Sequence, residues 1–362
     1  MNKPDAPIIM TGIAGNLGRL VMSRLHRHHK IIGIDRRPLG TIPPGVQHEQ
    51  VDMRRKKAQD IFRKSRAYGV VHLGIMHDPR MSDKEHYTWN VVGTENLLDY
   101  CAQYGVKKVV MLSSANNYGP MAGSSAYLDE DTPLLGSFAF PGIRDLVAVD
   151  RAVSSFFWKH PEIETVILRP VHIAGARLKN APSNYLRLKA IPHLLGFDPL
   201  VQLVHELDVV DAIAHALKPG VRGIFNIVGP PAIPLSKLLH QLGKPLVPVP
   251  HIFAKPLWQT FYNLRLSSFP APEWDFLRYE LLVDGERAKR ELGYEPRRST
   301  RDIINLFRPA EAMEPEFTPS AALGALSALT KSVKKRMAQK PEPHAPPHGP
   351  VDKLDLEPSG DE

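Results

Sequence analysis

Cysteine is nearly absent from this sequence, because Cys101 is the only one among 362 residues. A disulfide framework and a thiolate metal site are therefore both excluded, and a reducing compartment fits this usage. No run of about 18 apolar residues occurs, so a membrane-spanning helix is not expected. The N-terminal residues also contain no apolar signal region before a cleavage site. Together these absences predict a cytoplasmic protein.

Basic residues are in excess, since 46 Lys and Arg side chains stand against 38 Asp and Glu, for a formal net charge of +8. Such a surface favours anionic partners such as dinucleotides, nucleotide sugars, nucleic acid or acidic lipid. The densest basic run in the part expected to fold is Arg54–Lys57, either a solvated helix start or a contact for an anion. No aromatic residues interleave with it, so nucleic-acid binding is not expected. The 16 histidines show no clear metal-site spacing, and no metal is expected either.

The first 170 residues alternate short apolar runs with stretches of helical length. Strands are expected at Pro7–Thr11, Ile31–Asp35, Gly69–Gly74, Lys107–Ser113 and Ile163–Arg169, and helices at Asn16–His28, Met53–Ala67, Lys84–Tyr104 and Gly142–Lys159. The runs are β-branched and apolar nearly throughout, as strands covered on both faces are. Alternation at this spacing predicts right-handed βαβ units and an α/β fold with a Rossmann-type doubly wound parallel sheet.

Three glycines follow the first expected strand with the spacing G-x-x-G-x-x-G: Gly12, Gly15 and Gly18. The first permits a tight turn, the second lets the backbone approach a pyrophosphate, and the third lets the helix pack against the strand. The N-terminus of that helix presents free N–H groups to the phosphates. The pattern therefore predicts a dinucleotide site at the start of the chain.

Asp35 ends the second expected strand, 17 residues after Gly18. A carboxylate at this position accepts hydrogen bonds from the ribose hydroxyls of adenosine. Asp35 would repel a 2′-phosphate, which favours NAD over NADP. Arg36 and Arg37 follow directly and weaken that preference.

Eight stretches along the chain are informative when they are taken as one set. They are TGIAGNLG at 11–18, VD at 51–52, VVHLG at 70–74, NVVGTENLL at 90–98, KKVVMLSSANNYG at 107–119, LRPVHIAG at 168–175, LVHELDVVDAI at 203–213 and VDGERAKRELGYEPRRSTRDII at 283–304. As a set they resemble the extended short-chain dehydrogenase/reductase family, the NAD-dependent epimerase/dehydratase group, over about residues 7–308. The set is far more specific for fold and cofactor than for substrate.

The resemblance implies NAD as the cofactor, held at the positions that match the family's motifs. These positions are Gly12, Ala14, Gly15, Asn16, Leu17, Gly18, Asp35, Arg36, Asp52, Met53, Leu73, Gly74, Asn90, Leu112 and Pro170. Asp52 is similar to the aspartate that meets the adenine amino group. Pro170 lies in the segment that resembles the family's strand beside the nicotinamide.

The family's chemistry uses a Ser or Thr, a Tyr and a Lys, and Ser114 occupies the serine position. The tyrosine and lysine, four residues apart, are expected where residues 137–150 read SFAFPGIRDLVAVD. One alignment puts Gly142 and Leu146 at the two positions, and a register shifted by two puts Phe140 and Arg144 there.

The absence of the tyrosine and the lysine does not depend on which register is chosen. No tyrosine occurs between Tyr127 and Tyr185, and the lysines between them, Lys159 and Lys179, do not start the expected helix. Loss of a positioned general acid or base costs about 10² to 10⁴ in rate. The cofactor half of the site is thus expected to be intact, while the usual proton-transfer pair is absent.

Two residues are candidates to replace that pair beside Ser114. Tyr118 is expected near the substrate side of the sheet edge, with a packing or substrate contact as the alternative. His172 follows the Arg-Pro pair and suits proton transfer near neutral pH, with a satisfied loop histidine as the alternative. Two functions stay open: an epimerase/dehydratase-like oxidoreductase with an atypical acid/base, acting on a nucleotide sugar or a related hydroxyl or carbonyl compound, and a catalytically silent NAD-binding sensor or scaffold.

The chain is expected to divide into four parts. These are an NAD-binding Rossmann domain at 1–175, a smaller substrate lobe at 176–311 interleaved with late Rossmann elements, a basic amphipathic helical extension at 312–340 and a disordered proline-rich tail at 341–362,. Docking on the body or on a partner, weak membrane-surface contact and a loosely ordered helix are the alternatives for the extension. The family's four-helix interface implies a homodimer through the helices at 84–104 and 142–159.

Overall fold

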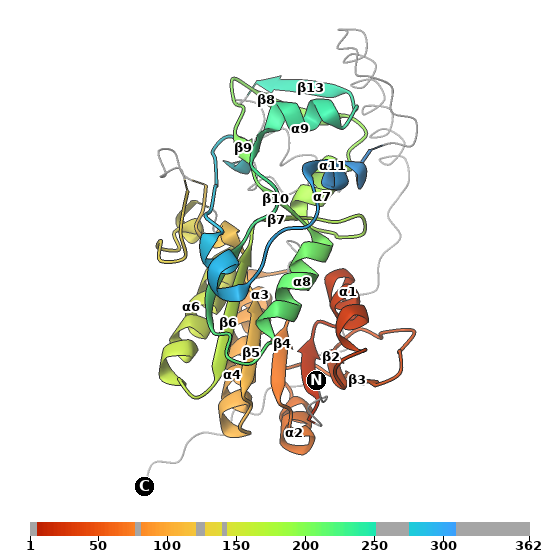
Figure 1. The fold of residues 1–362 in the computed structure, drawn as a ribbon, viewed down its shortest axis with the longest axis vertical. Helices are drawn as coiled ribbons and strands as arrows, with labels where there is room; N and C mark the ends of the chain where they lie inside the picture. Colours follow the sequence, from red (N-terminus) through yellow and green to blue (C-terminus); the bar gives the residue numbers. More distant parts are fainter. Residues whose placement is uncertain (1–5, 77–80, 121–126, 140–142, 251–274, 309–362) are drawn as a thin grey trace.

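A seven-stranded parallel sheet forms the centre of the molecule in the computed structural model, which describes residues 6–76, 81–120, 127–139, 143–250 and 275–308 (Figure 1). The strands lie in the order β11 (Gly223–Ile227), β6 (Glu164–Pro170), β5 (Lys108–Leu112), β4 (Gly69–His72), β1 (Ile8–Thr11), β2 (Ile31–Asp35) and β3 (Val46–Gln50). Each neighbouring pair is parallel. This is the predicted Rossmann-type fold, and that prediction is confirmed.

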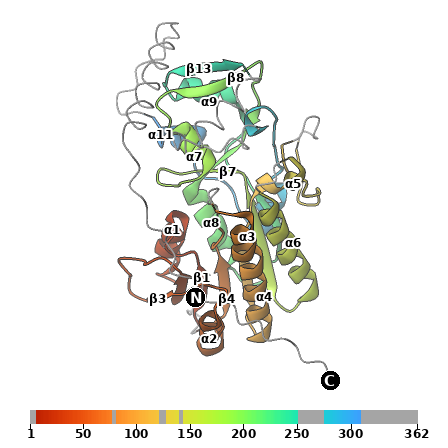
Figure 2. The same cartoon turned by 180° about the vertical axis from the view of Figure 1, so that it is seen from behind.

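Helices cover both faces of the sheet (Figures 1 and 2). One face packs against α1 (Asn16–Leu25) and α8 (Glu206–Ala216), and the other against α2 (Lys56–Ser65), α4 (Gly93–Gln103) and α6 (Arg144–Lys159). Successive strand residues serve opposite faces, as the two-residue period requires. In β1, Ile8 and Met10 belong to the first cluster and Ile9 to the second.

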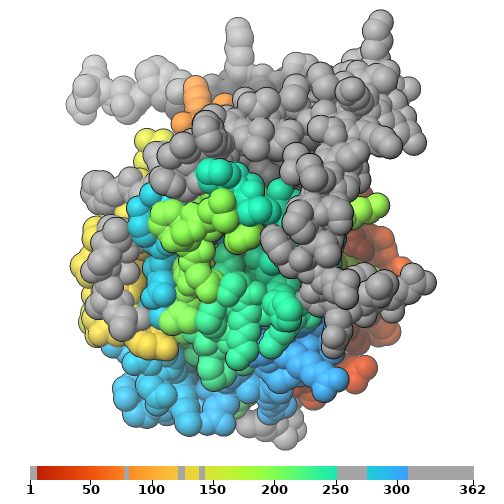
Figure 3. All heavy atoms as spheres, turned by 90° about the horizontal axis from the view of Figure 1, so that it is seen from above, coloured from red at the N-terminus to blue at the C-terminus, as the bar shows by residue number. Residues whose placement is uncertain are grey.

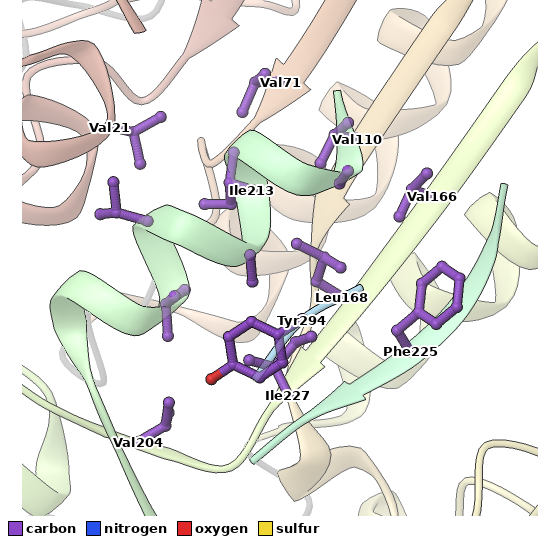
Figure 4. Packing of buried hydrophobic residues seen from close by; sticks show 14 of the residues in the cluster. Val21, Val71, Val110, Val166, Leu168, Val204, Ile213, Phe225, Ile227 and Tyr294 are labelled. Atoms are coloured by element: carbon purple, nitrogen blue, oxygen red, sulfur yellow. The ribbon is translucent and has the colours of Figure 1, made fainter. Parts of the chain in front are cut away.

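The first of these clusters continues past the sheet into the late part of the chain. Ile213 of α8 lies among Val71, Val110 and Leu168 of three neighbouring strands, as Figure 4 shows. Tyr294 packs into the same cluster. Residues after 200 therefore help to build the core of the nucleotide-binding sheet.

The single helix expected at 84–104 is wrong in detail, because the segment consists of three pieces. α3 (Asp83–Tyr87) is followed by η1 (Thr88–Val92), which is a π-helix, and then by α4. Ser82 caps α3 with a capping box that also uses Glu85. A π-turn inside a helix re-aims the side chains it carries, and such turns are frequent at functional sites.

A third hydrophobic cluster forms beyond the carboxyl ends of the strands (Figure 1). It draws on α7 (Ala181–Leu186), β8 (Ile191–Leu195), α9 (Leu235–Gln241), β13 (Leu246–Pro250) and α11 (Thr300–Asn305), together with Leu277. β8 and β13 pair in parallel. Seen from above, atoms of this green part lie against the blue atoms of the last described segment (Figure 3). The domain boundaries given above stay a prediction.

Two strands of the sheet were not expected. β3 carries the polar sequence VQHEQ at one edge, and β11 (GIFNI) returns to the other edge after a long excursion. The extension at 312–340, the tail at 341–362, Phe140 and Gly142 lie outside the described residues. Within the described ranges no helix is long and apolar enough to cross a membrane. The same residues hold no cluster of His, Cys, Asp and Glu side chains suited to a metal ion.

Candidate functional site

The predicted dinucleotide site lies where the strand order reverses, between β1 and β4. Thr11 and His72 are register partners at the carboxyl ends of these two strands. The loops that begin at Gly12 and Leu73 therefore leave the sheet side by side. In doubly wound sheets, ligands bind in the crevice at such a point.

The glycine loop is packed so tightly that side chains are excluded at two of its three glycines. Gly12 has φ +72°, and a Cβ there would lie 2.7 Å from the backbone carbonyl of Leu73. A Cβ on Gly18 would overlap the carbonyl oxygen of Gly12. At Gly15 the contacts are looser: the Cβ would lie 3.1 Å from Gly12 O and 3.6 Å from Nη2 of Arg37. The loop is thus shaped to bring backbone N–H groups against a ligand, as pyrophosphate binding requires.

Asp35 lies at the end of β2 with its carboxylate enclosed, and the side chain is 5% exposed. Oδ1 accepts from the backbone N–H of Arg37 at 2.9 Å and from its Nε at 3.1 Å. Oδ2 accepts from the backbone N–H of Ala14 at 3.1 Å and from Nη2 of Arg37 at 3.1 Å. Sequence reasoning noted Arg37 but did not place its guanidinium on this carboxylate. The spacing D-x-R was the available signal.

Asp52 repeats the same arrangement at the next loop. Oδ1 accepts from the backbone N–H of Arg54 at 2.9 Å, and Nη2 of Arg54 donates to Oδ2 at 2.6 Å. Hydrogen bonds and charge from Arg54 hold the pKa of Asp52 below its usual value, although burial acts in the opposite direction. The guanidinium carbons of Arg36 and Arg54 lie 4.7 and 4.8 Å from the ring centroid of Trp89, which η1 carries.

The loop after β4 is held by buried polar side chains. Asn90 accepts from the backbone N–H of Met76 at 2.7 Å and donates back to its carbonyl at 3.0 Å. Oγ1 of Thr11 accepts from the N–H of Gly74 at 3.2 Å and lies 2.6 Å from Nδ1 of His72. Burial lowers the pKa of His72 to about 4, so this imidazole is neutral near pH 7. These contacts fix the backbone of the loop at the predicted cofactor edge.

The other predicted cofactor residues lie around the same edge. Asn16 donates from Nδ2 to the carbonyl of Arg177 at 2.5 Å, which joins the first turn of α1 to the loop after β7 (His172–Ala174). Met53 and Pro170 are buried, and Leu17 and Leu112 are half-buried. Their individual contacts with NAD stay predictions.

Two serines with different hydrogen-bond partners, Ser113 and Ser114, follow strand β5 (Lys108–Leu112). Ser113 donates to Oδ2 of Asp150 at 2.5 Å, and its oxygen accepts from Nδ2 of Asn117 at 3.1 Å. Ser114 caps the short helix η2 (Ala115–Asn117) by accepting from the N–H of Asn116 at 3.1 Å. That bond uses the oxygen of Ser114 as an acceptor and leaves its hydroxyl hydrogen available to donate.

Tyr118 lies in the interior and is 1% exposed. Its hydroxyl donates to Oδ1 of Asn226 at 2.9 Å and accepts from Nη1 of Arg169 at 2.9 Å. Burial raises the pKa of Tyr118 to about 12, although the charge of Arg169 opposes this shift. Arg169 also forms an ion pair of 2.7 Å with Asp150, in which neither side chain is more than 4% exposed.

The start of α6 is where the family's lysine is expected. Nδ2 of Asn117 donates to the backbone carbonyl of Leu146 at 3.4 Å, so Leu146 adjoins the serine segment. One turn later, Asp150 binds both Ser113 and Arg169. This geometry agrees with the register that puts Leu146 at the lysine position. Arg144, the lysine position of the other register, is exposed and pairs with Asp83 at 3.6 Å.

His172, at the start of β7, faces the second lobe. Its ring packs edge-on against Phe276, with centroids 5.2 Å apart. Together with Gln202 and Tyr279 these residues line a small pocket. Nδ1 of His172 is buried and has no hydrogen-bond partner within the described part of the chain. Burial lowers the pKa of the imidazole to about 4.

The residues present fit a bound dinucleotide. The cradle at Gly12 and Gly18 excludes any Cβ, Asp35 ends the neighbouring strand β2, and Asp52 follows the edge strand β3 by two residues. The sheet, the glycine loop and the acidic strand ends define a dinucleotide-binding protein of the Rossmann class.

Comparison with known proteins agrees with this class. The model of the NAD dependent epimerase/dehydratase family matches residues 8–228, more than half of the chain. An uncharacterised protein of Mycobacterium tuberculosis is 24% identical over 327 residues, which cover 86% of each chain.

Two solved structures show the shared fold. A short-chain dehydrogenase/reductase superfamily protein of Agrobacterium tumefaciens with bound NAD has a TM-score of 0.66 and 22% identity, over 90% of this chain and 99% of its own. The UDP-glucose 4-epimerase of Thermus thermophilus in complex with NAD has a TM-score of 0.65 and 20% identity, over 84% and 100%. The chain belongs to the NAD-dependent epimerase/dehydratase family, and NAD is the cofactor of that family.

Proposed function

We propose that this protein is an oxidoreductase of the epimerase/dehydratase type that acts on a hydroxyl or carbonyl group of a nucleotide sugar or a related compound. The observation that carries the proposal is the position of Ser114. It lies at the carboxyl end of β5, the direct neighbour of β4, whose end forms the cofactor edge. UDP-glucose 4-epimerases and a dTDP-glucose dehydratase are among the solved structures with the same fold, which supports this substrate class.

The chain's own residues supply binding and orientation. The glycine loop would hold the pyrophosphate of NAD, and Asp35 and Asp52 would hold the adenosine. NAD supplies hydride exchange with a substrate carbon when it is bound. Ser114 donates its hydroxyl hydrogen to the substrate oxygen and so orients it.

Proton transfer falls to His172 in this proposal. Tyr118 is unsuited, because its hydroxyl already donates to Asn226 and accepts from Arg169, and its pKa is about 12. His172 has a ring nitrogen without a partner in the described structure and a pKa of about 4. A neutral imidazole carries one donor and one acceptor nitrogen, so it can pass a proton, although a low pKa makes it a weak base. Slow turnover is the expected consequence.

The test is single-turnover absorbance of reduced nicotinamide, with NAD and a panel of nucleotide sugars that includes UDP-glucose. Ser114→Ala and His172→Gln are expected to lower the rate about 10²-fold or more. Tyr118→Phe is the control, because it removes a buried hydrogen bond and leaves the two proposed groups in place. A rate that depends on Tyr118 and not on His172 would contradict the assignment.

A catalytically silent NAD-binding sensor or scaffold is the second candidate. The observation that favours it is the enclosed Tyr118 hydroxyl, in a sequence with no tyrosine between Tyr127 and Tyr185. It predicts NAD binding with a conformational change and no turnover on the whole panel. Limited proteolysis with and without NAD measures that change.

A further inference from the structure

The adenosine end of the cofactor site holds an arginine where a ribose hydroxyl would be recognised. A carboxylate offers about four lone-pair positions. All four of those on Asp35 are used: three accept from Arg37 and one from the backbone of Ala14. A ribose hydroxyl that donates to Asp35 must therefore displace an N–H of Arg37.

The guanidinium of Arg37 also reaches the phosphate loop. Its Nη2 lies 3.6 Å from the position that a Cβ on Gly15 would take. The side chain is 58% exposed although its head is paired to the buried carboxylate, so its outer edge remains open to a ligand. An anion at this point would accept from Arg37, whose charge offsets the repulsion by Asp35.

Two further guanidiniums lie at the same end of the site. Arg36 and Arg54 both lie against the ring of Trp89, at 4.7 and 4.8 Å. Arg54 is neutralised by Asp52 at 2.6 Å, whereas no ion pair to Arg36 is found within the described part of the chain. Its contact with the Trp89 ring holds Arg36 in place, and among the described residues its charge has no ion-pair partner.

From these contacts we propose that the site accepts a 2′-phosphate on the adenosine ribose, so that NADP binds as well as NAD. Arg37 is the residue that determines this specificity, and Arg36 supplies the second charge. Arginine suits the role because its planar fork binds phosphate oxygens in pairs. The inference rests on the cofactor site of the proposed function and not on turnover.

Calorimetric titration with NAD and NADP tests the proposal on full-length protein shown to be folded and free of cofactor. We expect the two dissociation constants of the wild type to lie within about tenfold of each other. Arg37→Ala should weaken NADP binding by about 10- to 100-fold, which is the worth of a charge-assisted hydrogen-bonded pair. NAD binding should be unchanged or tighter, because the competitor for Asp35 is gone.

Two further variants serve as controls. Arg63→Ala removes an arginine of the same kind, paired with Asp60 at 2.7 Å on the outer surface of α2, and should change neither constant. Arg37→Lys keeps the charge without the planar fork, so its dissociation constant for NADP should lie between those of the wild type and Arg37→Ala. Titration with adenosine 2′,5′-bisphosphate and with adenosine 5′-monophosphate repeats the comparison with ligands that occupy the adenosine subsite alone.

NADP binding more than about 100-fold weaker than NAD binding in the wild type would overturn the proposal. Equal weakening of both dinucleotides by Arg37→Ala would also overturn it, since Arg37 would then serve the whole site. Binding of neither would overturn it together with the cofactor assignment. Because no readout depends on turnover, an inactive protein that binds both dinucleotides contradicts the proposed function and supports this subsite.

Discussion

At the scale of single residues, the interior around Tyr118 is a closed polar network. Arg169 binds Asp150, Tyr118 and the backbone carbonyl of Glu130. A buried charge is tolerated only when it is paired and fully hydrogen-bonded, and each of these groups supplies a partner to the next. We infer that Tyr118 serves this network, in which its hydroxyl joins Arg169 of β6 to Asn226 of β11.

Two buried histidines make stability depend on pH. Burial lowers the folded-state pKa of both His72 and His172 from 6.5 to about 4. As the pH falls below 6.5, the unfolded chain takes up these protons first and the folded chain does not. Their contribution is therefore fully present above pH 6.5 and is lost as the pH falls toward 4.

The expected loss is about 3 kcal/mol per histidine at most. Urea unfolding of the wild type and of His72→Asn, at a series of pH values from 7 to 4, measures it. The variant is less stable at pH 7, because Thr11 and Thr94 lose their imidazole partner, but its stability should fall less steeply with pH. His28→Asn, at an exposed position in the turn after α1, should keep the wild-type slope. Equal slopes for the wild type and His72→Asn would contradict this account.

At the scale of elements, Gly18 and Gly93 form a matched pair of helical glycines. A Cβ on Gly18 would overlap the backbone of the phosphate loop. A Cβ on Gly93 in α4 would have no neighbour closer than 3.9 Å. The same substitution should therefore have opposite effects at the two positions.

Gly18→Ala is expected to destabilise the fold by about 1–3 kcal/mol through overpacking and to abolish NAD binding. Gly93→Ala should stabilise it by about 0.4–1 kcal/mol, because alanine restricts the unfolded chain without strain in the helix. Chemical denaturation and calorimetry with NAD measure the two effects. A Gly18→Ala protein that binds NAD like the wild type would disprove the role given to the loop.

Local patterns were sufficient to predict most of the sheet. β1, β2, β4, β5 and β6 are short apolar runs between helices, and their predicted positions agree with the structure to within one or two residues. β3 was missed because its sequence VQHEQ is polar and none of its residues is buried. β11 (GIFNI) ends in three buried residues, but Asn226 interrupts its apolar run and it stands outside the strand–helix alternation of the first 170 residues. The π-turn at η1 leaves the helical pattern nearly unchanged, so a single helix was the simplest expectation.

Some residues of the candidate site could likewise be predicted from local patterns, and others could not. The glycine loop and Asp35 follow from spacing along a continuous stretch, and spacing is visible in a sequence. The burial of Tyr118 depends on Arg169 and Asn226, which are 51 and 108 residues further along the chain. Contacts at such separations are set by the packing of strands β5, β6 and β11, which no local motif encodes.

At the scale of the whole molecule, the last described segment joins both parts of the structure. Arg298 pairs with Asp208 and Asp211 of α8, each at 2.7 Å. Val283 and Gln202 exchange two hydrogen bonds through the amide side chain of Gln202. Residues 275–308 therefore connect α8, which packs on the sheet, to the third hydrophobic cluster.

The remaining prediction concerns the outer surface of the molecule: a homodimer that forms through α4 and α6. These helices lie side by side on one face of the sheet (Figure 2). Along α6, Arg151, Ser155 and Trp158 share the outward face by their helical spacing, and Trp158 is 76% exposed,. An exposed tryptophan is the residue type most enriched among interface hot spots.

Sedimentation velocity of the wild type at micromolar concentration is expected to give a dimer. Trp158→Glu should weaken that dimer by about 30-fold or more, which is the loss of a typical hot spot of about 2 kcal/mol. Tyr127→Glu places the same charge on another exposed aromatic residue, 56% exposed and outside both helices, and should leave the dimer intact. A monomeric wild type would contradict the prediction of a dimer. Equal weakening of the dimer by the two substitutions would show that α6 is not the assembly surface. NAD titration of the Trp158→Glu monomer then separates assembly from cofactor binding, because every residue given to the cofactor lies in one chain.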